Sequence, residues 1–317
     1  MEQRLQHFPL PFFAAVMGLS GLAMAFNQAH RVLDLPAAIG RALTFVALGT
    51  FIVLAAFYLA KALRHPRAVK ADLTHPIRMS FAATISVSLL LLGALTLQLA
   101  PALSFGIWVV GALLHLAITL YVLTSWVYQP HFEIHHINPA WFIPVVGNIL
   151  APIAGVQHAG LEIGWFFFSI GLLFWLVLFT IIIYRMVFHH PLPDRLLPTL
   201  FILIAPPAAG FLAYLRLTES LDTFARVLYY GALFLTLWLV LQAPRFLRLP
   251  FYLSWWAYSF PLAAMTVATL TMAQLTEAGW LHALSHLLLW LLVVVIGWLV
   301  LRTLLAVLRG QICVPEQ

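Results

Sequence analysis

The chain has 317 residues, of which 63% are apolar and only 8% carry a formal charge. Soluble domains hold roughly 45–50% apolar and about 25% charged residues, so this composition excludes a soluble protein and places most of the chain in a lipid bilayer. A spanning helix takes roughly 20 apolar residues and about 30 with its connection. The length therefore predicts about ten spans, with residues 1–317 forming a single transmembrane domain with short tails.

Ten apolar stretches, separated by Pro, Gly and charged residues, are the predicted spans. None alternates with the period of two that is typical of a barrel strand, so an all-α integral membrane fold is predicted. The approximate limits are 9–28, 39–62, 77–99, 102–127, 139–157, 162–187, 196–215, 224–242, 251–274 and 281–306. The first stretch also resembles a signal peptide with a cleavage site at 23–25, but we expect a retained helix.

The basic residues are unevenly divided between the two sides that ten spans create. Twelve of the 16 Lys and Arg lie on the side of the tails. The other four are Arg31, Arg41, Arg216 and Arg226. Because cytoplasmic loops are enriched in Lys and Arg, both termini are predicted to be cytoplasmic. The net charge of +6 then reflects topology and does not call for a nucleic-acid partner.

Odd- and even-numbered spans differ in composition. Residues 257–274 include nine small or hydroxyl residues among 18, whereas 165–184 include three among 20. This alternation predicts five helical hairpins, with the odd helices inside around a central pore and the even helices outside. The alternative is that small residues only mark tight helix packing.

Prolines follow the same alternation. They interrupt the fifth, seventh and ninth spans, as Pro144, Pro152, Pro206, Pro207 and Pro261. A proline inside a helix removes a hydrogen bond and displaces the carbonyl four residues earlier. The carbonyls of Ala140, Asn148, Ile202, Leu203 and Ala257 are therefore predicted to be free and to face a cavity.

Charged residues are missing from the middle of every predicted span. Ion-coupled carriers usually keep an intramembrane ionisable group, and acidic rings select cations, so a passive path that does not conduct cations is favoured. No catalytic constellation, cofactor motif or metal motif is predicted, and the single cysteine, Cys313, excludes an internal disulfide.

Several histidines have a structural and a functional interpretation. His115, in the fourth span, is more typical of an interhelical hydrogen bond than of a proton relay. The loop 131–136 holds three histidines and a glutamate but matches no zinc motif, so we expect a solvated loop. His282 and His286 are expected to be an interfacial pair.

Five short motifs, in order along the chain, resemble the tellurite-resistance protein TehA and the plant slow anion channels over residues 8–310. They are Gly18-Leu19, Met79-Ser80-Phe81 after His75-Pro76, Asn138-Pro139 with Val145-Val146-Gly147-Asn148, Ile204-Ala205-Pro206-Pro207-Ala208-Ala209, and Trp255-Trp256-Ala257-Tyr258-Ser259-Phe260-Pro261 with Val267-Ala268-Thr269. Two positions depart from the family pattern. Val16 replaces a proline common in bacterial members, and Asn138 replaces a histidine.

The resemblance implies a fold of ten helices around one pore and a homotrimer with a pore in each subunit. It implies conduction of small inorganic anions such as chloride and nitrate, in a bacterial inner membrane. Some relatives are linked to tellurite resistance, sulfite efflux or malate transport, so a secondary transporter of oxyanions or C4-dicarboxylates is the alternative.

The resemblance also assigns the site. Phe260 is the predicted pore gate. The predicted pore-lining or gate-supporting residues are Gly18, Ser86, Pro144, Gly147, Asn148, Pro206, Pro207, Ser259 and Pro261. Asn148 is interpreted as a polar pore site or a structural tie between helices. Arg78 is interpreted as a vestibule charge or a side chain that snorkels to the interface.

Overall fold

The structure, a computed structural model, describes residues 2–314, and every regular element in this range is helical. The long helices are α2 (Phe13–Leu33), α3 (Ala37–Arg64), α5 (Arg78–Thr96), α6 (Pro101–Tyr128), α9 (Leu161–Phe188), α10 (Ala205–Thr218), α11 (Thr223–Val240), α13 (Ser259–Thr276) and α14 (Gly279–Leu308). The shorter elements are α1 (Glu2–Gln6), η1 (Leu10–Phe12), α4 (Pro66–Thr74), η2 (Ile134–His136), η3 (Pro139–Trp141), α7 (Phe142–Val146), η4 (Gly147–Leu150), α8 (Pro152–Ala159), η5 (Asp194–Ile204), α12 (Ala243–Phe246) and η6 (Leu253–Tyr258). Residues 1 and 315–317 of the predicted domain lie outside the described residues.

Nine helical stretches within 2–314 are long and apolar enough to cross a bilayer. They are Leu10–Leu33, Ala37–Arg64, Arg78–Thr96, Pro101–Tyr128, Pro139–Ala159, Leu161–Phe188, Asp194–Thr218, Thr223–Val240 and Gly279–Leu308. Each overlaps one predicted span almost throughout. The chain is therefore a multi-pass membrane protein, and the all-helical prediction is confirmed.

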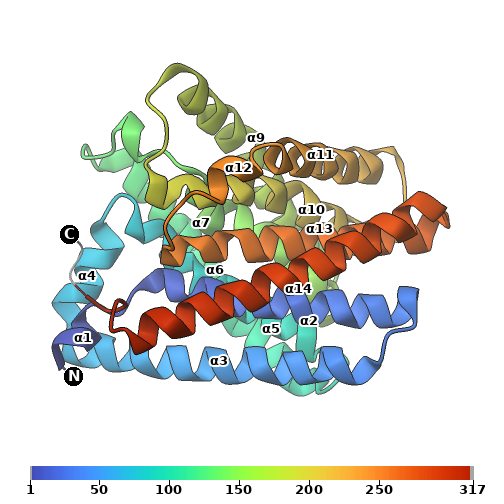
Figure 1. The fold of residues 1–317 in the computed structure, drawn as a ribbon, viewed down its shortest axis with the longest axis horizontal. Coiled ribbons are helices and arrows are strands. Elements are labelled where there is room, and N and C mark those ends of the chain that lie inside the picture. The colour runs from blue at the N-terminus through green and yellow to red at the C-terminus, as the bar shows by residue number, and fades with distance from the viewer. Residues whose placement is uncertain (1, 315–317) are drawn as a thin grey trace.

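The predicted ninth span corresponds to η6 and α13. This stretch is not among the nine, and its helix α13 contains Ser259, four threonines and Gln274. It contacts α2, α10 and α14, and Figure 1 shows it running alongside α14. The total of ten membrane crossings stays a prediction. The contacts of α13 with three other helices agree with its being one of the ten.

Burial alternates along the chain as the composition predicts. The first, third, fifth and seventh spans have 72–83% of their residues buried, whereas the even-numbered spans have 17–39%. In α13, 14 of the 18 residues are buried. The even helices therefore present large apolar side chains outward, where lipid or another membrane-embedded surface must cover them.

Several prolines of the inner spans lie where 3-10 helix changes to α-helix. Pro152 begins α8, and Pro206 and Pro261 lie in the first turns of α10 and α13. A proline in a first turn costs no hydrogen bond, because that N–H has no partner within the helix. The carbonyls of Asn148 and Ile202 each accept the N–H three residues later. The prediction that these two carbonyls are free is therefore wrong, because 3-10 bonding satisfies them.

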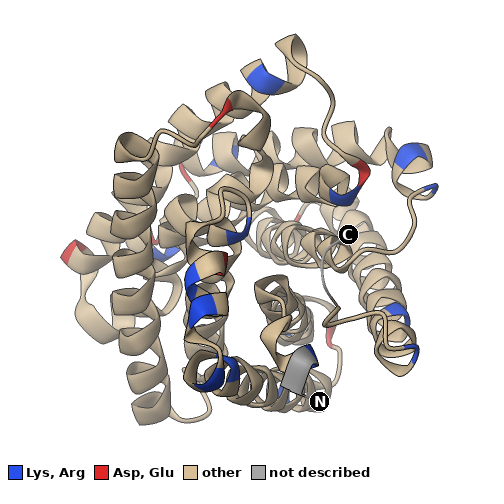
Figure 2. Ribbon diagram, turned by 90° about the vertical axis from the view of Figure 1, so that its left-hand side faces the viewer, with Lys and Arg blue, Asp and Glu red and all other residues tan. Residues whose placement is uncertain are grey.

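The first and last described residues lie at the same end of the bundle, which we name the termini end (Figure 1). Helix α2 begins there and α14 ends there. Figure 2 faces this end and shows Lys and Arg positions spread over its loops and helix ends. The arrangement agrees with the predicted clustering of basic residues on the side of the tails.

Candidate functional site

Phe260 lies at the centre of the bundle, in contact with three small cavities. Two have volumes of about 40 Å³ and the third about 10 Å³, room for only a few water molecules. Among the described residues, Phe260 alone lines all three, and it is 8% exposed. The phenyl ring therefore lies where three spaces would otherwise meet.

The inner helices supply the walls of these cavities. The first cavity lies between α2, α5, α7, η4 and α10, with Ala205, Pro206 and Ala209 on the α10 side. The second extends toward the termini end and includes the hydroxyl residues Thr84 and Ser254. The third extends the other way along α2, α10 and α13. The walls are mostly apolar, so they offer an ion few groups that bind it tightly.

The predicted site residues divide into two groups. Phe260, Gly147, Pro206 and Pro261 line the cavities. The others lie behind the walls: Gly18, Ser86, Pro144, Asn148, Pro207 and Ser259.

Two glycines of α2 bring this helix close to α13 beside the ring. A Cβ atom on Gly18 would lie 2.6 Å from Cβ of Ser259, and one on Gly21 would lie 3.8 Å from Cδ2 of Phe260. The Ser259 hydroxyl donates a hydrogen bond to the Trp256 carbonyl at 2.7 Å. Gly18 and Ser259 therefore support the position of the ring without contacting the cavities.

A buried polar network ties α6 to the fifth span and to α5. Asn148 Nδ2 donates to Thr119 Oγ1 at 2.9 Å, and the Thr119 hydroxyl lies 2.7 Å from the Pro144 carbonyl oxygen. Ser86 Oγ lies 2.8 Å from His115 Nδ1. These contacts favour the structural interpretation of Asn148 and confirm the expected interhelical hydrogen bond of His115.

A cavity of about 700 Å³ opens at the termini end, and we name it the vestibule. Four of its lining residues, Pro11, Phe81, Leu253 and Ser254, also line the second cavity. Its ionisable side chains come from several elements: His7, Lys61, Asp72, His75, Arg78, Arg195, Tyr252 and Cys313. The vestibule and the three cavities therefore follow one another from the termini end into the bundle, with Phe260 at the junction of the three cavities.

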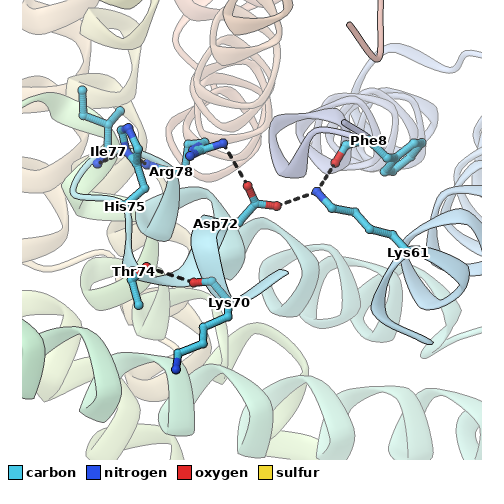
Figure 3. A network of polar contacts seen from close by, with 8 residues as sticks. All are labelled: Phe8, Lys61, Lys70, Asp72, Thr74, His75, Ile77 and Arg78. Atoms are coloured by element: carbon cyan, nitrogen blue, oxygen red, sulfur yellow. Dashed lines mark hydrogen bonds and ion pairs between the residues drawn. The ribbon is translucent and has the colours of Figure 1, made fainter. Parts of the chain in front are cut away.

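Asp72 is the centre of an ion-pair network in the vestibule wall (Figure 3). Its Oδ2 lies 2.6 Å from Lys61 Nζ and its Oδ1 lies 3.2 Å from Arg78 Nη1. Lys61 Nζ also donates to the Phe8 carbonyl at 2.8 Å. The Lys61 side chain is 3% exposed, whereas that of Arg78 is 35% exposed. Arg78 therefore faces the vestibule, in agreement with its interpretation as a vestibule charge, and Lys61 is a buried structural cation.

The pattern of apolar spans in the sequence does not predict the ion pairs of Asp72 with Lys61 and Arg78. The one available signal is Pro66, which begins α4, since proline is favoured in a first helical turn. A helix between the second and third spans places Asp72 beside both cations.

The loop histidines form no metal site in the part of the chain that the structure describes. His135 and Glu133 make an exposed pair at 3.2 Å. Burial, and then the nearby His135, lower the pKa of His136. His286 Nδ1 contacts the His282 carbonyl at 2.9 Å, which is a contact within one helix.

Comparison with known proteins gives one family. The model of the SLAC1 family, described as voltage-dependent anion channel, matches residues 7–304. An uncharacterized transporter of Methanocaldococcus jannaschii is 29% identical over 85% of this chain and 86% of its own length. The S-type anion channel SLAH2 of Arabidopsis thaliana is 30% identical over 84% of this chain and 53% of its own length. The tellurite resistance protein TehA homolog of Haemophilus influenzae is 26% identical over 96% of this chain and 93% of its own length.

Proposed function

We propose that this chain, which belongs to the SLAC1 family of voltage-dependent anion channels, forms a passive path for small monovalent anions such as chloride and nitrate, gated by Phe260. The observation that carries the proposal is the place of the Phe260 ring at the junction of three cavities, in series with a basic vestibule. Membership of a family described as anion channels supports a negatively charged ion as the one that passes. The family consists of channels and transporters, and we propose no enzymatic activity and no cofactor.

The physical basis of gating is the size of the ring. Small residues such as Gly147, Ala209 and Ala264 line the cavities beside the ring. Larger side chains, among them Phe142 and Trp256, also line them. While the ring occupies this place, the separate cavities hold too little water to solvate an ion. Movement or removal of the ring joins them into one space. Vestibule cations raise the local anion concentration, and apolar walls let the ion leave as readily as it enters.

The test is anion current through purified protein in planar bilayers. Phe260→Ala is expected to raise chloride and nitrate current well above that of the wild type, because it joins the cavities. The control is Leu262→Ala, which shortens a buried side chain of α13 that lines none of the three cavities. Unchanged current in a correctly assembled Phe260→Ala protein overturns the gate assignment.

A secondary transporter of oxyanions or C4-dicarboxylates is the second candidate. It is favoured by the names of relatives, which include an uncharacterized transporter and a tellurite resistance protein homolog. In a carrier, uptake of labelled substrate saturates and is accelerated by substrate on the opposite side. A channel shows unitary current steps without this acceleration.

We further propose a bacterial inner-membrane location with both termini cytoplasmic, and a homotrimer with one pore per subunit. The location is supported by the basic residues at the termini end. The trimer is supported by the exposed apolar side chains of the even helices, such as Phe45 and Leu173, part of which a neighbouring subunit would cover.

A further inference from the structure

The row of residues that lines the path on α2 continues beyond the last cavity. Ala14, Met17, Gly21 and Met24 line one or another cavity at alternating spacings of three and four residues. Because an α-helix has 3.6 residues per turn, this spacing keeps them on one face. The next positions on the same face are 28 and 31, which hold Gln28 and Arg31.

The rows on α10 and α13 continue in the same way. On α10, Leu212 lines the third cavity and Arg216 lies one turn later. On α13, Val267 lines that cavity and Gln274 lies two turns later. At a rise of about 1.5 Å per residue, these four polar side chains start roughly 6–10 Å beyond the cavity, at the end of the bundle opposite the termini.

Hydrogen bonds fix the orientation of the two amides. Gln28 Nε2 donates to Gln274 Oε1 at 2.9 Å and thereby bridges α2 and α13. Gln28 Oε1 accepts from Arg31 Nε at 3.1 Å, and also from Arg31 Nη2. Gln28 is 6% exposed, so its amide is held in place. With its oxygen occupied by the guanidinium, Gln28 keeps one further N–H with which to donate.

The side chains of Arg31 and Arg216 are both exposed, and their positive charges repel each other. Neither forms an ion pair with a carboxylate anywhere in residues 2–314. Asp34, Glu219 and Glu277, the acidic residues that follow α2, α10 and α13, also make no such pair with them. In the vestibule, Asp72 binds both Lys61 and Arg78, whereas Arg195 forms no ion pair with a described carboxylate.

We infer that Arg31, Arg216 and the Gln28 amide form a binding site for a small monovalent anion at the end of the path opposite the termini. An anion between the two guanidiniums offsets their repulsion and accepts hydrogen bonds that no described carboxylate takes. The site can bind an anion whether or not the protein conducts ions. Its role in admitting anions to the path rests on the proposed function.

The first test measures binding with bromide as the probe. Thermal unfolding of the purified protein is followed in sodium bromide and in sodium gluconate at equal ionic strength. Bromide is expected to raise the Tm of the wild type, and most of the rise is expected to be lost in the double variant Arg31→Gln/Arg216→Gln. The control is Arg226→Gln, which removes an exposed arginine of the outer helix α11. An equal rise in the double variant and in the control overturns the inference.

The second test measures sided current in the Phe260→Ala background. Arg31→Gln and Arg216→Gln are each expected to reduce by about threefold the current of anions that enter from the end opposite the termini. This is the effect on an anion of removing one positive charge about 7 Å away in a water-filled mouth. The reduction is expected to vanish near 1 M salt, where the screening length is about 3 Å. Equal losses in both directions, or a loss matched by Arg226→Gln, contradict the site. If Phe260→Ala carries no current, the proposed function fails and the bromide measurement alone decides the inference.

Discussion

At the scale of the residue, Asp72 decides the electrostatics of the vestibule. One buried carboxylate holds a buried lysine and a half-exposed arginine, and through Lys61 it is joined to the backbone at Phe8. A carboxylate at the mouth of a proposed anion path reduces its positive charge. Its position against Lys61 gives it a structural role.

We expect Asp72→Asn to destabilise the protein by roughly 3–5 kcal/mol, because it leaves the Lys61 ammonium buried without a counter-charge. Thermal unfolding of the purified variant measures this loss. The matched control is Asp194→Asn, which changes an exposed carboxylate at the start of η5 and is expected to stay within about 0.5 kcal/mol of the wild type. Equal stability of the two variants would mean that Lys61 does not depend on Asp72.

The residues of the proposed path differ in how far the sequence predicts their positions. The motif around Phe260 identifies the ring through resemblance, and the cavities place it at the centre. Ser86, Asn148 and Ser259 are polar and lie in inner spans, yet their side chains bond to neighbouring helices or to their own backbone. Composition tells which helix is inner, but not which face of it meets the lumen.

At the scale of the element, the approach of α2 to α13 places the ring. We expect Gly18→Ala to cost about 1–3 kcal/mol of stability, because its Cβ would lie 2.6 Å from Cβ of Ser259, which is fixed to its own backbone. Gly49→Ala, on the outer helix α3, has open space around the new methyl group and is expected to be neutral or slightly stabilising. Denaturation of both variants in the same detergent compares them. Equal stability would contradict the close contact of α2 with α13.

The elements themselves follow closely from the sequence. Apolar runs predict ten spans, because a bilayer leaves the backbone no alternative to the helix, and nine of them coincide with long apolar helical stretches within residues 2–314. Small residues predict which spans are inner. Helix α4 and the 3-10 segments are not predicted, since their hydrogen bonds depend on where loops and prolines fall in three dimensions.

At the scale of the whole molecule, the orientation in the membrane is tested by the single cysteine. A membrane-impermeant maleimide is expected to leave Cys313 unlabelled in intact cells and to label it after permeabilisation, because the termini end is proposed to be cytoplasmic. Burial raises the pKa of this thiol, so the thiolate fraction is low at neutral pH and labelling is expected to speed up as the pH rises.

The control for this experiment is Ser220→Cys in a Cys313→Ser background. Ser220 is exposed just beyond α10, at the end opposite the termini, so its cysteine is expected to react in intact cells. The reverse pattern of labelling would invert the proposed orientation.

The central claim is that a passive anion path runs through the bundle and is closed by Phe260. Single-channel recording of the Phe260→Ala protein across a chloride gradient tests it most directly. We predict unitary current steps that reverse near the chloride equilibrium potential and are absent or much rarer in the wild type and in Leu262→Ala. A Phe260→Ala protein that is correctly assembled but shows no unitary steps, or a current that reverses at the cation potential, would contradict the account.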